Sequence, residues 1–340
     1  MTSRPAPGST IRDVAARAGV SIRTVSRVLN RSPKVNAQTR ERVEETIARL
    51  GFRRSARARG LATGRSYLIA LLHNDRNALV LDTLQRGVVE AASARGYELV
   101  VHPAPADGSD VVEDILDFAA RSRVDGLVVM APVSGIPGLA EELAGAGIPA
   151  VALAAVDIAG FADRLVSDER GAAASVARYL RDLGHRRIGL VNGPLDAQSA
   201  QERRAGFVEA AEGLAVAEAA GDYGFDTGYA AAEILLSADP KPTAIFAAND
   251  VMAAGVLKAA AGRGIAVPGD LSVVGFDGSV LARMLTPALT SVHRPLAQMA
   301  GSATTRLLDI IEGEGDARGL SAELTLVERE SSGPAPAVLQ

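Results

Sequence analysis

The chain has 340 residues, of which 48% are hydrophobic, and it carries a formal charge of −4 and no cysteine. This length and apolar content predict two or three domains. The lack of cysteine excludes disulfides, thiolate zinc sites and thiol nucleophiles, and the 4 histidines are not spaced as metal ligands. Residues 1–9, expected to be disordered, lack the apolar run of a secretory signal, and no apolar stretch is long enough to span a membrane. We therefore expect a cytoplasmic protein without a metal or cofactor.

The charge is distributed unevenly along the chain. Residues 1–65 contain 15 Lys or Arg and 4 Asp or Glu, a formal charge of +11, whereas residues 66–340 carry −15. Clustered cations gain affinity for a polyanion because each neutralised phosphate releases counterions. The pattern favours double-stranded DNA as the partner of the first segment. A solvated basic tail is the alternative, and the regular patterning of this segment argues against it.

Residues 10–54 are predicted to form three helices. The first has apolar residues at helical spacing and should end at Gly19. The second follows Ser21, a good capping residue, and the third begins after Asn36 and ends at Gly51. Three helices of this length, with a tight turn between the first two, form a helix-turn-helix domain.

The second helix should present Ile22, Arg23, Ser26 and Arg27 outward and enter the major groove of DNA. Arginine can make paired hydrogen bonds to guanine there, and isoleucine can touch a thymine methyl group. We expect specificity from Ile22, Arg23 and Arg27. Short hydrogen-bonding side chains near the helix starts suit phosphate oxygens, although helix capping explains several of them equally well: Ser21, Thr24, Asn30, Asn36 and Thr39.

The sequence resembles the lac repressor and galactose repressor family in three stretches: DVAARAGVSIRTVSRVLN (13–30), VNAQTRERVEETIARLGF (35–52) and ARARGLATGRS (56–66). The likeness continues to about Leu326. The resemblance implies that residues 55–66 form a hinge helix whose leucine enters the minor groove of the operator. Leu61 matches that leucine, and Ser55 and Ala58 lie in the same segment. Arginines at 53 and 54, and Gly60 within the helix, depart from the family pattern.

The hinge segment has about two turns, far below the roughly 12 residues at which an isolated helix becomes marginally stable. A glycine inside it costs about 1 kcal/mol more, and four arginines in residues 53–59 repel one another until phosphates neutralise them. We expect the hinge to fold only on DNA, beside the hinge of a second subunit. The alternative is a flexible linker in which Leu61 is anchored to the body of the protein.

Beyond residue 66, short apolar runs alternate with helical stretches. The runs lie at 67–72, 97–101, 126–130, 149–153, 187–191, 244–248 and 271–276. Apolar runs flanked by helices predict parallel strands that are buried on both faces. Glycines that precede several runs are candidate helix C-caps: Gly96, Gly147, Gly184 and Gly264.

This repetition predicts doubly wound α/β sheets, and seven or more strands fit two Rossmann-like lobes better than one sheet. The family resemblance implies a periplasmic-binding-protein type I fold in which the chain crosses between the lobes three times. We place the crossings near Val166, Val292 and Leu326. The expected N-lobe is 67–165 with 293–326, and the expected C-lobe is 166–292 with 327–335.

Ligands bind such sheets beyond the carboxyl ends of the strands, so the cleft between the lobes is the expected effector site. A sugar suits carboxylate, amide and guanidinium groups with an aromatic platform. The expected effector-binding residues are Asp75, Asn77, Arg203, Tyr223, Asn249, Asp277 and Arg294. His73 and Asn74, which follow the first strand, are further candidates. The alternatives are that Asn249 and Asp277 only cap the following helices and that His73 and Asn74 have turn and capping roles.

The stretch after the first strand resembles the family branch associated with glycosides such as salicin, which makes a β-glucoside or a short oligosaccharide the first candidate effector. A purine or another small metabolite is the alternative. The expected protein is a homodimeric repressor of a pseudopalindromic operator. A transport-associated binding protein should lack the basic segment, and an enzyme should show a phosphate loop or an activated nucleophile, neither of which we find. His185 and His293 are expected at the surface or the rim, and the last residues, SSGPAPAVLQ, are expected to be a loose end.

Overall fold

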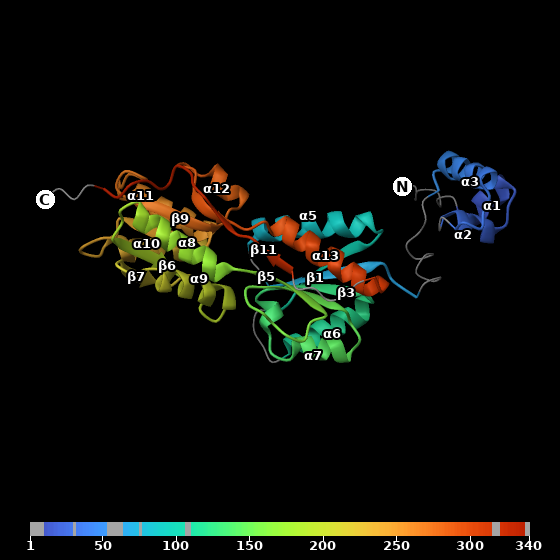
Figure 1. Ribbon diagram of the computed structural model, residues 1–340, viewed down its shortest axis with the longest axis horizontal. Coiled ribbons are helices and arrows are strands. Elements are labelled where there is room, and N and C mark those ends of the chain that lie inside the picture. The colour runs from blue at the N-terminus through green and yellow to red at the C-terminus, as the bar shows by residue number, and fades with distance from the viewer. Residues whose placement is uncertain are drawn as a thin grey trace, which may run out of the picture. The chain divides into compact units, whose positions relative to one another are not determined.

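The computed structural model describes residues 10–29, 32–52, 64–74, 77–105, 110–314 and 320–336. The chain divides after Tyr67 into two compact units, which we call the helical unit and the α/β unit (Figure 1). Five of the predicted site residues lie outside the described residues: Asn30, Ser55, Ala58, Leu61 and Asp75.

The helical unit has the three predicted helices. Its core is formed by Val14, Val25, Val28 and Val43, each at most 3% exposed. Each helix is amphipathic, so the three apolar faces can be buried only against one another. The helices are α1 (Ile11–Ala18), α2 (Ile22–Leu29) and α3 (Ala37–Leu50).

The ends of these helices follow the sequence signals, and the predictions for them are confirmed. Gly19 and Gly51 adopt left-handed backbone angles, with φ of 63° and 57°, and terminate α1 and α3. Asn36 caps α3 by accepting a hydrogen bond of 2.8 Å from the Thr39 amide. The backbone groups that a helix end leaves unpaired are therefore satisfied locally.

The α/β unit contains two six-stranded sheets, each the centre of one lobe. In the first lobe the sheet order is β11-β5-β4-β3-β1-β2, and all its pairs are parallel. Its strands are β1 (Leu68–His73), β2 (Glu98–Pro103), β3 (Gly126–Met130), β4 (Ala150–Ala154), β5 (Asp163–Ser167) and β11 (Leu320–Ala322). Its helices are α5 (Ala78–Ala94), α6 (Val111–Ser122), α7 (Leu139–Gly145) and α13 (Leu296–Glu312), with a 3₁₀ turn at Val133–Gly135.

The second lobe has the order β12-β10-β9-β8-β6-β7, and only β12 is antiparallel to its neighbour among the described strands. Its strands are β6 (Arg187–Val191), β7 (Ala215–Ala219), β8 (Ala244–Ala247), β9 (Ser272–Asp277), β10 (Thr290–His293) and β12 (Thr325–Val327). Its helices are α8 (Glu169–Asp182), α9 (Gln198–Glu209), α10 (Phe225–Leu236), α11 (Asp250–Gly262) and α12 (Val280–Met284).

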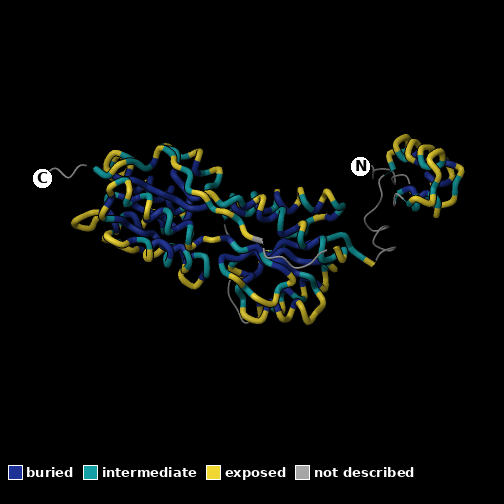
Figure 2. The backbone as a smooth tube through the Cα atoms, viewed as in Figure 1, coloured by how far each residue is buried: buried dark blue, intermediate teal, exposed yellow. Residues whose placement is uncertain are grey.

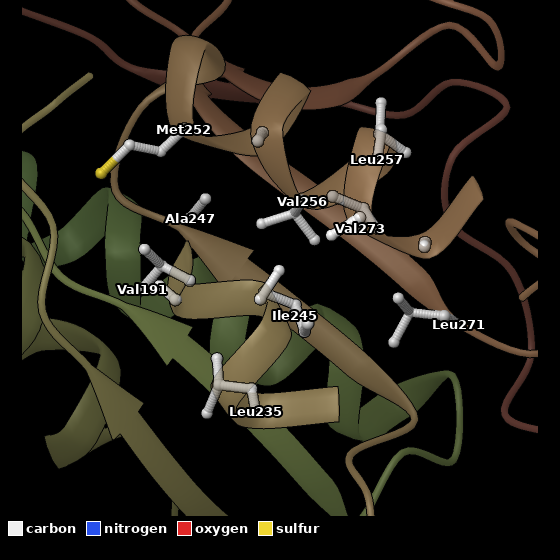
Figure 3. Close-up of a cluster of buried hydrophobic side chains, with 14 of the residues drawn as sticks. Val191, Leu235, Ile245, Ala247, Met252, Val256, Leu257, Leu271 and Val273 are labelled. Carbon is white, nitrogen blue, oxygen red and sulfur yellow. The ribbon is translucent and has the colours of Figure 1, made fainter. Parts of the chain in front are cut away.

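The second sheet is buried on both faces, as its continuous apolar runs predict. One face packs on α10 and α11 through Ile245, Val256 and Val273, which Figure 3 shows interleaved. The opposite face packs on α8 and α9 through Phe207 and Phe246, whose rings stack 5.1 Å apart. Buried strands therefore run through the centre of each lobe while exposed positions lie on the outer helices and loops (Figure 2).

The chain passes between the two lobes three times. It leaves the first sheet at the end of β5 and enters the second lobe at α8, and it returns after β10 through α13, which packs on β3, β4 and β5. The last passage lies between β11 and β12. The predicted apolar runs correspond to seven strands, whereas β5, β7, β10, β11 and β12 were missed because their residues are only partly apolar.

Two expectations about the ends of the second lobe are wrong. His185 is fully buried, not at the surface, and its Nδ1 lies 2.9 Å from Thr243 Oγ1. The described part of the C-terminal segment, which was expected to be a loose end, is instead bonded to the lobe: Ser331 Oγ donates to the Val273 carbonyl at 2.6 Å. This segment covers His185, because Gly333 O lies 3.1 Å from its Nε2. His293 is exposed, as predicted.

Candidate functional site

Helix α2 presents the side chains that were predicted to read DNA. Ile22 is 45% exposed, Arg23 is exposed and Arg27 is half-buried, while Val25 and Val28 anchor the opposite face. An exposed isoleucine on a small helical unit has no packing role to explain it, so this helix face is available to a partner. The guanidinium groups of Arg23 and Arg27 make no hydrogen bond to any residue within the described ranges.

The short polar residues around α2 and α3 are engaged in capping. Ser21 Oγ accepts a hydrogen bond of 3.1 Å from the Thr24 amide and lies 2.9 Å from Thr24 Oγ1. Asn36 caps α3 in the same way through the amide of Thr39. The structure thus accounts for Ser21 and Asn36 without DNA, and contact of these residues with phosphates stays a prediction.

The second predicted site lies at the carboxyl edge of the second sheet. Arg203 comes from α9, Asp277 ends β9 and Arg294 follows β10, and the structure brings all three together. Arg294 Nη1 donates to Asp277 Oδ1 at 3.2 Å, and Arg203 Nη2 lies 3.8 Å from the same oxygen. The side chains of Arg203 and Asp277 are only 4% and 5% exposed.

Glu169, which the sequence analysis missed, joins the two arginines. Its Oε2 accepts from Arg203 Nε at 2.8 Å, its Oε1 lies 3.1 Å from Arg294 Nη2, and the side chain is 1% exposed. Burial by itself raises the pKa of Glu169, but the charges of Arg203 and Arg294 outweigh it and hold that pKa below its usual value. We call Glu169, Arg203, Asp277 and Arg294 the charge cluster.

Arg203 is fixed on both its edge and its face. Its Nη1 donates to the Ala248 carbonyl at 2.5 Å, and its Cζ lies 4.0 Å from the centre of the Phe276 ring. A guanidinium stacked on an aromatic ring gains cation–π attraction when it is desolvated. Arg294 differs, because its Nε is a buried donor that lacks a hydrogen-bond partner among the residues that the structure describes.

Asp277 and Asp250 form the acidic side of this region. Asp277 has a φ of 113°, a backbone conformation that a non-glycine residue rarely adopts and that is typical of strained functional positions. Asp250 accepts from the Ser279 amide at 2.7 Å and from Ser291 Oγ at 2.5 Å. Burial, together with the charge of Asp277, raises the pKa of Asp250 to about 7.

Tyr223 and Asn249 lie beside the cluster and support each other. Asn249 Oδ1 caps α11 through the Met252 amide at 2.8 Å, while its Nδ2 donates to the Tyr223 carbonyl at 2.9 Å. Asn249 thus caps α11, as the capping alternative expects, and its role in effector binding stays a prediction. The Tyr223 ring lies 5.6 Å from Arg203 Cζ and packs on Gly193, where an added Cβ would be 2.4 Å from the ring.

The polar residues at the carboxyl edge of the first lobe's sheet differ from those of the charge cluster. Asn77 caps α5 by accepting from the Leu79 amide at 3.1 Å, His73 is buried at the end of β1, and Asn74 is half-buried. A surface groove between α5 and α13 also belongs to this lobe, and none of its lining residues is in the charge cluster. We therefore locate the candidate effector site by the buried charges of the second lobe.

The described ranges contain neither a metal-binding cluster nor a membrane-spanning helix. No group of three or more His, Cys, Asp or Glu is placed to hold a metal ion. No described helix combines the length and the hydropathy that crossing a bilayer requires.

Comparisons with known proteins agree on both units. Residues 10–55 match the bacterial regulatory proteins of the lacI family, and residues 177–332 match the periplasmic binding protein-like domain. The catabolite control protein A of Priestia megaterium is 36% identical over 305 residues, which cover 88% of this chain and 91% of that protein. The HTH-type transcriptional repressor PurR of Escherichia coli O139:H28 is 34% identical over 335 residues, covering 96% and 98% of the two chains.

Solved structures extend these similarities. The lac repressor dimer bound to operator and the anti-inducer ONPF has a TM-score of 0.79 and 29% identity, covering 96% of this chain and 100% of that one. The complex of the transcriptional regulator CelR with cellobiose has a TM-score of 0.68 and 31% identity, covering 95% and 99%.

Proposed function

Because the chain belongs to the lacI family of bacterial regulatory proteins and is therefore a DNA-binding transcriptional regulator, we propose that it is a repressor that a small carbohydrate releases from a pseudopalindromic operator. It acts as a homodimer whose two helical units contact the two half-sites. The relatives are transcriptional regulators, and we propose no catalytic step for this chain.

The observation that carries the effector proposal is the buried donor of Arg294. A buried polar atom without a partner costs free energy, so its Nε is best explained as a contact that a ligand completes. Around it, Arg203 and Asp277 offer donors and acceptors for hydroxyl groups, and the Tyr223 ring provides an apolar platform. This combination suits a sugar.

Specific DNA contact is proposed for α2, through Ile22, Arg23 and Arg27. Residues 10–54 are the proposed DNA-binding domain, and residues 55–66 are the proposed hinge. The hinge orders when two subunits bind DNA side by side, because alone it is too short to hold a helical conformation.

Coupling between the two sites follows from where the charge cluster lies. Glu169 is the first residue of α8, directly after the chain leaves the first lobe, and Arg294 lies between β10 and α13, where it returns. A ligand that contacts these residues acts on two of the three connections between the lobes. The lobes then change their arrangement, the start of β1 moves, and the hinges of the two subunits lose their register.

The two lobes approach each other closely at Gly135. An added Cβ on Gly135 of the first lobe would lie 3.0 Å from Gln198 Oε1 of the second.

By reciprocity, operator DNA must weaken effector binding by the same factor by which the effector weakens DNA binding.

A thermal-shift screen of sugars and glycosides, with cellobiose and other β-glucosides first, should identify the effector. The hit is then added to a gel-shift titration with the promoter region of the protein's own gene at low ionic strength. The proposal expects a retarded band that the hit abolishes. A protein that fails to bind this DNA with and without candidate sugars contradicts the proposal.

A further inference from the structure

The arginines of the charge cluster already have carboxylate partners. Arg203 Nε donates a hydrogen bond to Glu169. One Nη of Arg294 pairs with Glu169, and the other donates to Asp277. A phosphate group is recognised in proteins by an arginine fork that presents two parallel donors. Arg203 Nη1 also donates to the Ala248 carbonyl, so an incoming anion would have to displace groups of the chain from both arginines.

The positive helix ends at this edge are neutralised as well. Helix N-termini attract anions because their amides are unpaired and the helix dipole is positive there. In α8 the Asp168 carboxylate accepts from the Gly171 amide at 2.8 Å, and Glu169 is the first helical residue. In α11 the Asn249 side chain caps the Met252 amide, and Asp250 is the first helical residue.

The ionised groups of the cluster therefore balance. Two guanidinium groups face the two carboxylates of Glu169 and Asp277, and Asp250 adds a further acidic group nearby. Among the described residues of the cluster, the cationic groups therefore do not outnumber the acidic ones. The unpartnered Arg294 Nε is a single donor, which suits an oxygen of a hydroxyl group better than a dianion.

We infer that Glu169 sets the charge preference of the effector site, so that the site accepts uncharged hydroxylated ligands and rejects their phosphorylated forms. The inference rests on the proposed function, because it concerns the effector of that same site. Glu169 acts through the arginines: at 1% exposure it lies within 3.1 Å of both of them, whereas Asp277 lies 3.2 Å from Arg294 and 3.8 Å from Arg203. It is a positioning residue that also supplies the compensating charge.

Glu169→Gln tests this inference because it removes the charge and keeps the shape. The matched control is Glu202→Gln, which removes the same charge from α9, where Glu202 pairs at 2.9 Å with the half-exposed Arg170. The probes are inorganic phosphate, and glucose against glucose 6-phosphate. Isothermal titration should show that E169Q binds phosphate at least about tenfold more tightly than E202Q and the wild type, because two arginines then face one carboxylate.

E169Q can lose stability, since Arg203 and Arg294 lose their shared partner. Melting curves against phosphate concentration, with sodium chloride at matched ionic strength, resolve this: phosphate should raise the melting temperature of E169Q more than that of E202Q, because a ligand that binds the folded state stabilises it. Equal phosphate responses of the two variants overturn the inference. So does a wild type that binds glucose 6-phosphate as tightly as glucose or more tightly.

The same experiments separate this inference from the proposed function. If no uncharged sugar shifts the melting temperature of the wild type, the carbohydrate effector is wrong, yet the comparison of E169Q with E202Q still decides the role of Glu169. If a sugar binds and the phosphate responses are equal, the effector proposal stands and the charge preference fails.

Discussion

Arginine has opposite surroundings in the two units of this protein. In the helical unit Arg23 is exposed on α2 and no described residue accepts a hydrogen bond from its guanidinium, whereas in the α/β unit Arg203 is 4% exposed and bonded to Glu169. A cation without a counter-charge favours a polyanion, and a cation that is neutralised inside the protein can only offer hydrogen bonds. The partner of each unit thus depends on where the nearest carboxylate lies, and not on the arginine alone.

The largest test of this comparison is to break the buried pair. Arg203→Met leaves Glu169 with one partner fewer, and we expect it to lower the free energy of unfolding of the α/β unit by about 3–5 kcal/mol. Arg204→Met is the control, because Arg204 pairs with Glu218 at the surface, where such a pair contributes at most about 1 kcal/mol. Urea denaturation measures both.

The double variant R203M/E169Q sharpens this result. Removing both partners of a buried pair is much less costly than removing one, so the double variant should regain most of the loss. Equal losses for R203M and R204M would show that the buried pair does not contribute more than the exposed one.

The corresponding change in the helical unit should leave its stability alone and weaken DNA recognition. Arg23→Ala is expected to cost about 1–3 kcal/mol in operator affinity while changing affinity for a scrambled duplex far less. Arg49→Ala removes an exposed charge from α3 and should not lower the affinity for one duplex more than the affinity for the other. Gel-shift titrations with both duplexes decide this. A loss at R23A that is equal for both duplexes would reduce Arg23 to a general phosphate contact.

A pH titration tests the acidic side of the buried site. The raised pKa of Asp250, about 7, means that the folded state keeps a proton that the unfolded chain releases near pH 4. Stability contributed by this group therefore falls as pH rises between about 4 and about 7, by up to about 1.4 kcal/mol per unit, and is constant above that range. The wild type minus Asp250→Asn difference in unfolding free energy should show this slope. A flat difference would contradict the raised pKa.

The smallest expected effect concerns a helix cap of the helical unit. Ser21→Ala removes the acceptor of the Thr24 amide and should lower the unfolding free energy of this unit by about 1 kcal/mol. Ser26→Ala, one turn further along α2, should stay within about 0.5 kcal/mol. Thermal unfolding measures both, and similar values for the two variants would mean that Ser21 is not needed as a cap.

The sequence determined the parts of this protein that depend on local order. Capping signals placed the end of α1, the start of α2 and both ends of α3 within a residue of those observed. The glycines at 96, 147, 184 and 264 all have the left-handed φ that is common at helix ends. Continuous apolar runs placed seven strands, of which only β2 lies at the edge of its sheet. These features are short-range, so the chain itself carries the information.

Tertiary structure decided what depends on neighbours far apart in the sequence. Strands β5, β7, β10, β11 and β12 lack a continuous apolar run and form because a neighbouring strand is available to pair with. Of these, β7, β11 and β12 are edge strands, and β5 and β10 lie one place inside an edge. His185 is buried because the C-terminal segment folds over it. Glu169 gave no signal in sequence, since an acidic residue at a helix start is ordinary; only folding places it against Arg203 and Arg294, 34 and 125 positions away.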